Sequence, residues 1–159
     1  MVSLKNMQAA PSPKYLRISW SQFNEDTVSL SKKLINQNWK GIVAITRGGL
    51  VPANILAYEL DIKLIDTICI SSYDDQDQKN ANIIKKPESA DIKDGSGWLV
   101  VDDLIDTGKT AEIIRAHYPK ATFVTTYAKT HGKAFVDHYS IETTSNQWIL
   151  LPWDEDPEK

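Results

Sequence analysis

GWLVVDDLIDTGKTAEII, residues 97–114, holds three kinds of segment in a fixed order. The apolar run at residues 98–101 is typical of a strand buried in a parallel sheet. Three carboxylates and a small polar turn at residues 107–110 follow, and an apolar segment typical of a helix closes the stretch. This order predicts a strand–turn–helix unit of an α/β fold, with polar chemistry at the carboxyl end of the strand.

The residues of this turn suit a phosphorylated sugar. Gly108 permits a positive φ or a close backbone approach, and the threonines beside it can cap a helix. A helix N-terminus presents backbone N–H groups and the positive end of its dipole, which suits a phosphate. Asp102 and Asp103 suit ribose hydroxyls or Mg²⁺. Acidic residues after a buried strand can also be purely structural, and the Walker motif GxxxxGK[ST] is absent.

A second strand–turn–helix unit precedes this one. Residues 41–45 predict a core strand and residues 50–60 a helix, with Pro52 tolerated in its first turn. Arg47, Gly48 and Gly49 lie between them, and glycine amides beside a cation can form a cradle for a diphosphate. The alternative is a plain turn with a surface arginine. The presence of the acidic unit favours the cradle.

Composition limits the class of protein. The chain has 159 residues, 42% hydrophobic and 25% charged, which is ordinary for one globular domain. The net charge of −3 gives no electrostatic footprint for binding nucleic acid. The single cysteine, Cys69, excludes an internal disulfide framework and fits a reducing cytosol. No apolar run approaches the ~20 residues of a membrane span.

The remaining segments complete a mainly parallel sheet covered on both faces. We expect a flexible leader at residues 1–14, a short edge strand at 15–18, and strands at 64–72 and 121–128. Ser19 and Gln22 fit a capping box, so a helix is expected from Ser19 to about Asn36–Asn38. The polar stretch at residues 73–95 is long for a connection, which favours either a functional lid or disorder.

Several motifs together resemble one family. VVDDLIDTGKTA at residues 100–111 resembles the phosphoribosyl diphosphate binding motif of the type I phosphoribosyltransferases. TRGGLVP at 46–52 resembles the diphosphate loop of that family, and ISSYDDQDQKN at 70–80 its mobile catalytic loop. From about residue 14 to 154, the chain resembles the bacterial xanthine-guanine branch. The resemblance implies one domain at 15–159, with a core at about 15–130, a hood at about 131–153 and a lid at about 73–95.

The resemblance also implies a reaction. The 5-phosphoribosyl group would pass from phosphoribosyl diphosphate to N9 of guanine or xanthine, and more weakly of hypoxanthine, with Mg²⁺ as cofactor. The resemblance also implies a strained or cis peptide bond near Thr46–Arg47. A cytoplasmic homotetramer or homodimer is implied too, along with a loose association with the inner membrane in one relative.

The resemblance assigns residues to each part of the substrates. Asp106 would lie near N7 of the base as a proton acceptor or hydrogen-bond partner. Asp106 and Lys79 would act in catalysis, and Asp103 would bind the metal. Lys79 stands where a well-known relative has arginine, so the bidentate grip on phosphate is lost while the charge remains. The binding residues form three groups: for the diphosphate Arg47, Gly48, Gly49 and Lys79; for the ribose and 5-phosphate Asp102, Asp103, Asp106, Thr107, Gly108, Lys109 and Thr110; for the purine Lys129, Trp148 and Ile149.

Two other functions remain open at this point. One is a non-catalytic relative that senses nucleotides or binds RNA, against which the negative net charge counts. The other is transfer to uracil or orotate. Lys129 and the flat ring of Trp148 favour a 6-oxopurine, because lysine donates to a 6-oxo group and not to an amino group. His131, just beyond Lys129, is expected at the surface.

Overall fold

The computed structural model describes residues 14–71 and 82–158. The predicted leader, apart from its last residue, and the part of the predicted lid that contains Lys79 lie outside these ranges. The helices and strands within them are β1 (Tyr15–Arg17), α1 (Trp20–Ser31), β2 (Gly41–Thr46), α2 (Leu50–Glu59), β3 (Ile65–Ser71), β4 (Asn82–Lys85), β5 (Trp98–Ile105), α3 (Lys109–His117), β6 (Thr122–Lys129), η1 (Lys133–Phe135), β7 (His138–Thr143) and β8 (Trp148–Leu150).

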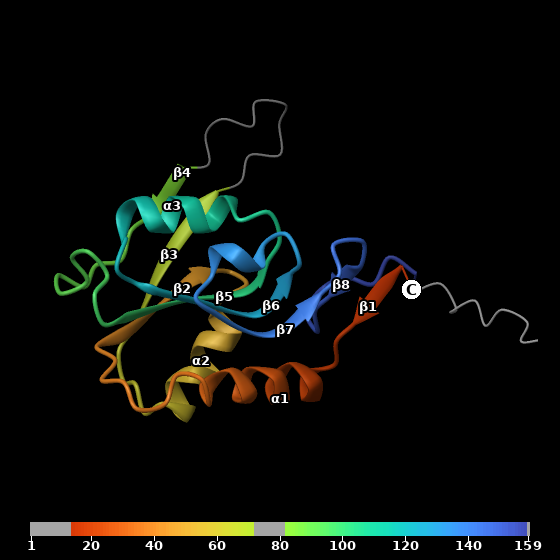
Figure 1. Ribbon diagram of the computed structural model, residues 1–159, viewed down its shortest axis with the longest axis horizontal. Helices are drawn as coiled ribbons and strands as arrows, with labels where there is room; N and C mark the ends of the chain where they lie inside the picture. Colours follow the sequence, from red (N-terminus) through yellow and green to blue (C-terminus); the bar gives the residue numbers. More distant parts are fainter. Residues whose placement is uncertain (1–13, 72–81, 159) are drawn as a thin grey trace, which may run out of the picture.

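Six strands form the main sheet in the order β4-β3-β2-β5-β6-β7 (Figure 1). All neighbouring pairs are parallel except β3 with β4. The chain leaves β2 toward β3 on one side and later returns to β5 on the other side of β2. The order therefore reverses between β2 and β5, and open α/β sheets bind their ligands outside the carboxyl ends of strands at such a point.

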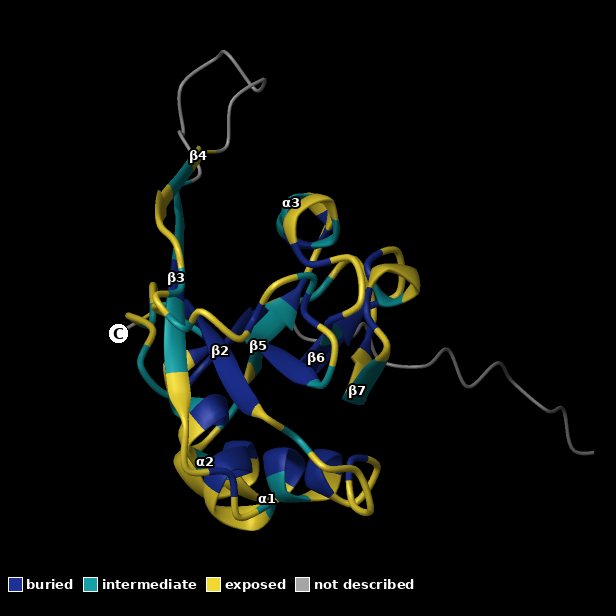
Figure 2. Ribbon diagram, turned by 90° about the vertical axis from the view of Figure 1, so that its left-hand side faces the viewer, coloured by how far each residue is buried: buried dark blue, intermediate teal, exposed yellow. Residues whose placement is uncertain are grey.

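Helices cover both faces of this sheet, as the apolar runs predicted. Figure 2 shows α1 and α2 below the central strands and α3 above them. Alternate residues of each strand enter different cores: Val43 and Val100 pack with Ile114 of α3, whereas Ile42 packs with Leu56 of α2. Strands buried on both faces lack a polar side, which explains the uninterrupted apolar sequence of β2 and the start of β5.

A small two-stranded sheet of β1 and β8 forms the hood, where Leu16 lies opposite Ile149. Ile149 and Leu151 pack with Phe23 of α1 and Tyr127 of β6, which fixes the hood to the main body. The Arg17 guanidinium binds both carboxylate oxygens of Asp156, at 2.8 and 3.1 Å. The C-terminal residues are thereby tied to the first strand.

Three boundaries differ from those expected. Helix α1 ends at Ser31 instead of near Asn36–Asn38, and Asn36 has a positive φ of 71°. Strand β7, expected in the hood, is an edge strand of the main sheet, so the hood contains β8 and the N-terminal β1 instead. The far end of the range expected for the lid packs on the body, because Ile92 is buried in the core.

The capping box is only half formed. The Ser19 hydroxyl accepts from the Gln22 backbone N–H at 3.1 Å, as predicted. The Gln22 side chain instead donates to Asp26 at 2.9 Å. Asp26 is buried and also accepts from the Tyr127 hydroxyl at 2.6 Å, so its second oxygen competes successfully for the glutamine.

In the described part of the chain, every helix is too short or too polar to cross a bilayer.

Candidate active site

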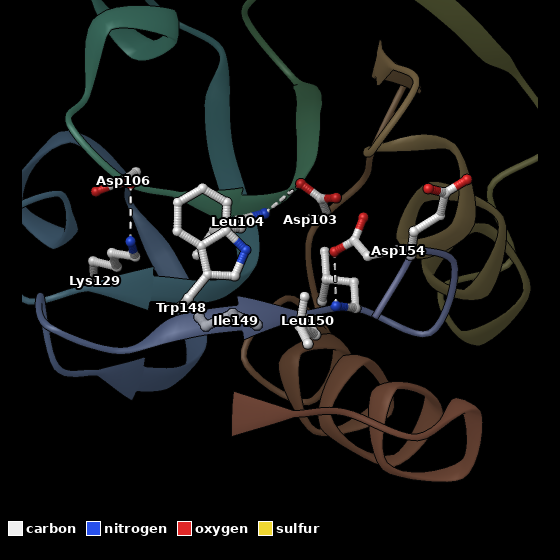
Figure 3. A pocket seen from close by; sticks show the side chains of 10 residues that line it. Asp103, Leu104, Asp106, Lys129, Trp148, Ile149, Leu150 and Asp154 are labelled. Carbon is white, nitrogen blue, oxygen red and sulfur yellow. Dashed lines mark hydrogen bonds and ion pairs between the residues drawn. The ribbon is translucent and has the colours of Figure 1, made fainter. Parts of the chain in front are cut away.

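Polar residues from three adjacent strands meet at one edge of the main sheet. Asp103 lies near the carboxyl end of β5, Lys129 is the last residue of β6, and Arg47 follows the last residue of β2. Since these three strands are parallel neighbours, their carboxyl ends lie side by side. The hood strand β8 faces this edge and brings Trp148 over it (Figure 3).

A cleft of about 470 Å³ opens between this edge and the hood. Trp148 is 64% exposed, so one of its faces is available to a flat ligand. Lys129 is buried to 8% exposure, and its Nζ lies 6.0 Å from the centre of the Trp148 ring. The residues around the cleft are Asp103, Leu104, Asp106, Lys129, Trp148, Ile149, Leu150, Leu151, Asp154 and Glu155.

Asp106 has a partner on each carboxylate oxygen. Its Oδ2 accepts from Lys129 Nζ at 2.9 Å, and its Oδ1 lies 2.7 Å from His131 Nε2. Partial burial acts to raise the pKa of Asp106, but the hydrogen bonds from Lys129 and His131 outweigh it and hold the pKa below its usual value. Asp106 is therefore a fixed, ionised acceptor beside the cleft.

Asp102 and Asp103 lie in the opposite situation. Burial raises the pKa of Asp102 well above its usual value, and the charge of Asp103 adds to this effect. Burial also raises the pKa of Asp103, to which the Asp154 carboxylate contributes by repulsion. Their hydrogen bonds come from neighbouring backbone: Asp103 N–H donates to Asp102 at 2.9 Å, and Leu104 N–H donates to Asp103 at 2.7 Å. Adjacent carboxylates with raised pKa values favour a cation or hydroxyl donors between them.

A second cleft, of about 550 Å³, adjoins the first and shares Asp103 and Asp154 with it. Arg47 and Gly48 line it from the turn after β2. The Thr46–Arg47 peptide bond is cis, which confirms the expectation for this turn. A Cβ on Gly48 would lie 2.4 Å from a carboxylate oxygen of Asp103, so only glycine allows the turn to approach this closely.

The turn between β5 and α3 has the conformation expected of a phosphate-binding turn. Gly108 is the residue before the helix, and its φ is +85°. The ring of Phe135 lies against it, 2.3 Å from where a Cβ would be. Helix α3 begins at Lys109, so its first N–H groups follow Asp106 closely. Residues 107–110 line neither cleft directly.

The carboxylates at this site suit a magnesium ion that binds together with a substrate phosphate. Among residues 14–71 and 82–158, no group of three or more His, Cys, Asp or Glu side chains could hold a metal alone. Mg²⁺ is commonly held by one or two carboxylates together with substrate phosphates. Asp102 and Asp103, with their raised pKa values, fit that kind of site.

The structure therefore brings together many of the predicted site residues. Asp103, Asp106, Lys129, Trp148 and Ile149 line one cleft, and Arg47 and Gly48 line its neighbour. Gly49 instead packs in the fold, because a Cβ there would lie 2.2 Å from the Val101 carbonyl oxygen. Lys79 lies outside the described residues.

Sequence reasoning missed three residues. Asp154 and Glu155 line the first cleft, although no motif marks them in the sequence. His131 is exposed, as expected, yet it also bonds to Asp106. Its position two residues after Lys129 was the available signal, since Lys129 ends β6 and His131 follows directly after that end.

Comparison with known proteins agrees with this arrangement. The sequence profile of the family described as "Phosphoribosyl transferase domain" matches residues 19–158. The chain is 52% identical over 139 residues to a xanthine-guanine phosphoribosyltransferase of Desulfotalea psychrophila, covering 86% of this chain and 84% of that one. It is 45% identical over 149 residues to a protein of the same name from Cereibacter sphaeroides, covering 91% and 89%.

A solved structure shows the same fold. A purine phosphoribosyltransferase from Pyrococcus horikoshii superposes with a TM-score of 0.78 at 28% sequence identity, covering 91% of this chain and 97% of that one. The mainly parallel sheet flanked by helices, the carboxylates after β5 and the sequence matches all agree. This chain therefore belongs to the phosphoribosyl transferase domain family.

Proposed function

We propose that this protein transfers the 5-phosphoribosyl group from phosphoribosyl diphosphate to N9 of a 6-oxopurine, as in purine salvage. The observation that carries the proposal is the Lys129–Asp106 pair, at 2.9 Å, in a cleft that the exposed ring of Trp148 covers. The names of relatives at 45% and 52% identity support it, since both are xanthine-guanine phosphoribosyltransferases. Those names give no support to a non-catalytic sensor.

The base end of the cleft suits guanine, xanthine and, more weakly, hypoxanthine. Lysine carries only donors, so Lys129 can donate to a 6-oxo group, whereas the amino group of adenine would offer it another donor. The face of Trp148 can stack on the purine ring. The backbone of Ile149 lies on the same strand, where it can reach the 2-position.

The reaction needs one bond to break, one to form and one proton to leave the base. The bond from ribose C1 to the diphosphate oxygen breaks largely first, and its electron pair leaves with the diphosphate. N9 then supplies the pair for the new bond to C1, which has become oxocarbenium-like. Asp106 accepts the proton that the base gives up near N7, or a hydrogen bond from it.

The sugar end of the cleft would hold the donor. Arg47 and the amides of the glycine turn would bind the diphosphate, and Lys79 belongs to this group by sequence. Asp102 and Asp103 would hold the ribose hydroxyls, and Asp103 would bind Mg²⁺. A magnesium ion there would neutralise charge on the departing diphosphate. The helix N-terminus after Gly108 would take the 5-phosphate.

A competition assay tests the function directly. The purified chain is incubated with phosphoribosyl diphosphate, Mg²⁺ and radiolabelled guanine, with xanthine or hypoxanthine as the competing base. We expect labelled GMP and competition by both other bases, more weakly by hypoxanthine. Uracil and orotate should neither react nor compete. A failure to form GMP, together with tight RNA binding, would favour the sensor instead.

The assembly and the location are part of the same proposal. We propose a homotetramer or homodimer in the cytoplasm. Exposed apolar side chains are available for contacts between copies, among them Tyr58 at 83% exposure and Ile84 at 69%. Light scattering of the purified protein measures the assembly, and a monomer at all concentrations would contradict this part.

A further inference from the structure

The imidazole of His131 connects the Asp106 side chain to the loop before β8. Its Nε2 lies 2.7 Å from Asp106 Oδ1, and its Nδ1 lies 2.5 Å from the Ser145 hydroxyl oxygen. The side chain is 46% exposed and does not line the first cleft. His131 can therefore act on a bound base only through Asp106.

The backbone around His131 packs on the same turn that carries Asp106. A Cβ on Gly132 would lie 2.3 Å from the Asp106 carbonyl oxygen, so the two backbones are in close contact. Phe135 packs its ring on Gly108 in the same turn. These two contacts hold the segment 131–135 in place, and with it the position of the imidazole relative to the carboxylate.

The hydrogen bonds define the protonation pattern of the ring. An ionised carboxylate only accepts, so His131 Nε2 must carry a hydrogen and donate it to Asp106. In the neutral ring Nδ1 is then an acceptor, and the Ser145 hydroxyl donates to it. In the charged ring Nδ1 also carries a hydrogen and donates to the Ser145 oxygen. The hydroxyl accommodates both states, so the geometry survives a change of charge on the ring.

We propose that His131 is a positioning residue that holds the Asp106 carboxylate toward the base by donating to it from Nε2. The inference rests on the proposed role of Asp106 in the transfer reaction. The Nε2–H group, 2.7 Å from Oδ1, fixes the direction of the carboxylate, while the contact of Nδ1 with the Ser145 hydroxyl fixes the ring.

Other charged groups near His131 do not replace this effect. Lys129 bonds to the other oxygen of Asp106 and lies on the same strand end. Lys133 of η1 pairs with Glu142 of β7 at 2.9 Å, so their charges largely cancel. The pKa of Asp106 is already low because the Lys129 and His131 hydrogen bonds outweigh its burial.

The test compares His131→Ala and His131→Gln with the wild type in the guanine assay. At about pH 8.5 we expect His131→Ala to lower kcat about tenfold, the scale of one lost charge-assisted hydrogen bond, with the KM of phosphoribosyl diphosphate changed less than about twofold. The amide of His131→Gln can donate from a position close to that of Nε2, so it should restore most of kcat. His117→Ala is the matched control, because the hydrogen bond of His117 among the described residues is to the Ile113 carbonyl of its own helix.

Rescue by glutamine separates positioning from a merely structural role. Glutamine keeps a donor near the place of Nε2, so kcat should recover while the KM of phosphoribosyl diphosphate stays close to that of the wild type. The kcat of His117→Ala should match that of the wild type. A structural disturbance would change kcat and KM together and would not be repaired by glutamine.

The possible failures are distinguishable. A wild-type protein without activity refutes the proposed function itself. An active wild type with His131→Ala at full kcat refutes the role of His131. A His131→Gln variant that restores none of the kcat lost in His131→Ala also overturns the inference. Thermal unfolding of each variant checks that the fold is intact.

Discussion

The two ends of the cleft hold carboxylates in opposite electrostatic settings. At the base end, Asp106 contacts Lys129 through one oxygen and His131 through the other. At the proposed sugar end, Asp103 lines both clefts, whereas its neighbour Asp102 lines neither. Within the described residues neither of the two forms an ion pair with a lysine, arginine or histidine. The pKa of Asp106 is accordingly lowered, whereas those of Asp102 and Asp103 are raised.

Under the proposed function, this difference matches what each substrate brings. A neutral purine would meet a carboxylate that already has its cations in Lys129 and His131. Phosphoribosyl diphosphate bound with Mg²⁺ would supply positive charge to Asp103, whose carboxylate has a raised pKa. Clustered groups with shifted pKa values in opposite directions are typical of sites that do chemistry.

Removal of the base-end carboxylate should have the largest effect. We expect Asp106→Ala to lower kcat by about 100- to 1,000-fold, because a general base contributes on this scale. The KM of phosphoribosyl diphosphate should change less than about threefold, since the sugar end is intact. Asp94→Ala is the control, as Asp94 pairs with Lys120 at 2.8 Å away from both clefts. Equal losses in kcat and donor affinity would contradict this role for Asp106.

Removal of the Asp103 charge at the sugar end should instead affect the use of phosphoribosyl diphosphate. We expect Asp103→Asn to lower kcat/KM for phosphoribosyl diphosphate about 100-fold, the effect of losing one electrostatic contact to the transition state. The Mg²⁺ concentration for half-maximal rate should rise, because one ligand is weakened. Initial rates over a magnesium series measure both. If the KM of guanine changed as much as that of the donor, the two ends would not be separate.

Removal of the base-end cation should have a smaller and more selective effect. We expect Lys129→Ala to raise the KM of guanine about tenfold, since a hydrogen bond to a charged group contributes about 1.5–3 kcal/mol. Donor affinity should remain nearly unchanged. Lys120→Ala removes a lysine from an exposed pair with Asp94 and serves as the control. Unaltered guanine kinetics would remove Lys129 from the purine site.

Local sequence was sufficient for the features that depend on neighbouring residues. The two strand–turn–helix units follow from apolar runs and the glycine-containing turns after them, and the Ser19 cap follows from a spacing of three residues. The assignment of β7 to the main sheet could not be read in this way, because it depends on pairing with β6 and not on its own pattern. Edge strands with mixed burial carry little periodic signal.

The residues of the site also fall into those that local sequence predicts and those that only the folded arrangement brings together. Asp102, Asp103 and the glycine turn were predicted because they are contiguous in one motif. The contact of His131 with Asp106 joins residues 25 positions apart. Asp154, which follows β8, lines the cleft together with residues of β5 and β6 that are distant in sequence. Such contacts are created by the arrangement of strands, so composition and spacing do not encode them.

The smallest predicted effect concerns stability, where the two ends should differ in sign. When folding raises the pKa of a carboxyl, the folded protein becomes less stable as the pH increases above the pKa of that carboxyl in the unfolded chain, about 4. Asp102→Asn removes that penalty, so at about pH 7 the variant without ligand should be more stable than the wild type by about 1 kcal/mol. Near pH 4 the difference should vanish, because the wild-type carboxyl is then largely protonated.

Asp106→Asn should act in the opposite direction. A lowered pKa contributes stability above the unfolded pKa, and this contribution is lost only as pH falls through the folded pKa. The variant should therefore be less stable than the wild type at about pH 7, by an amount that the exposure of Asp106 keeps small. Urea unfolding of both variants at about pH 4 and 7 measures the two signs. If both substitutions destabilised the protein equally at neutral pH, the surplus charge at the sugar end would carry no energetic cost, and the contrast between the two ends would not hold.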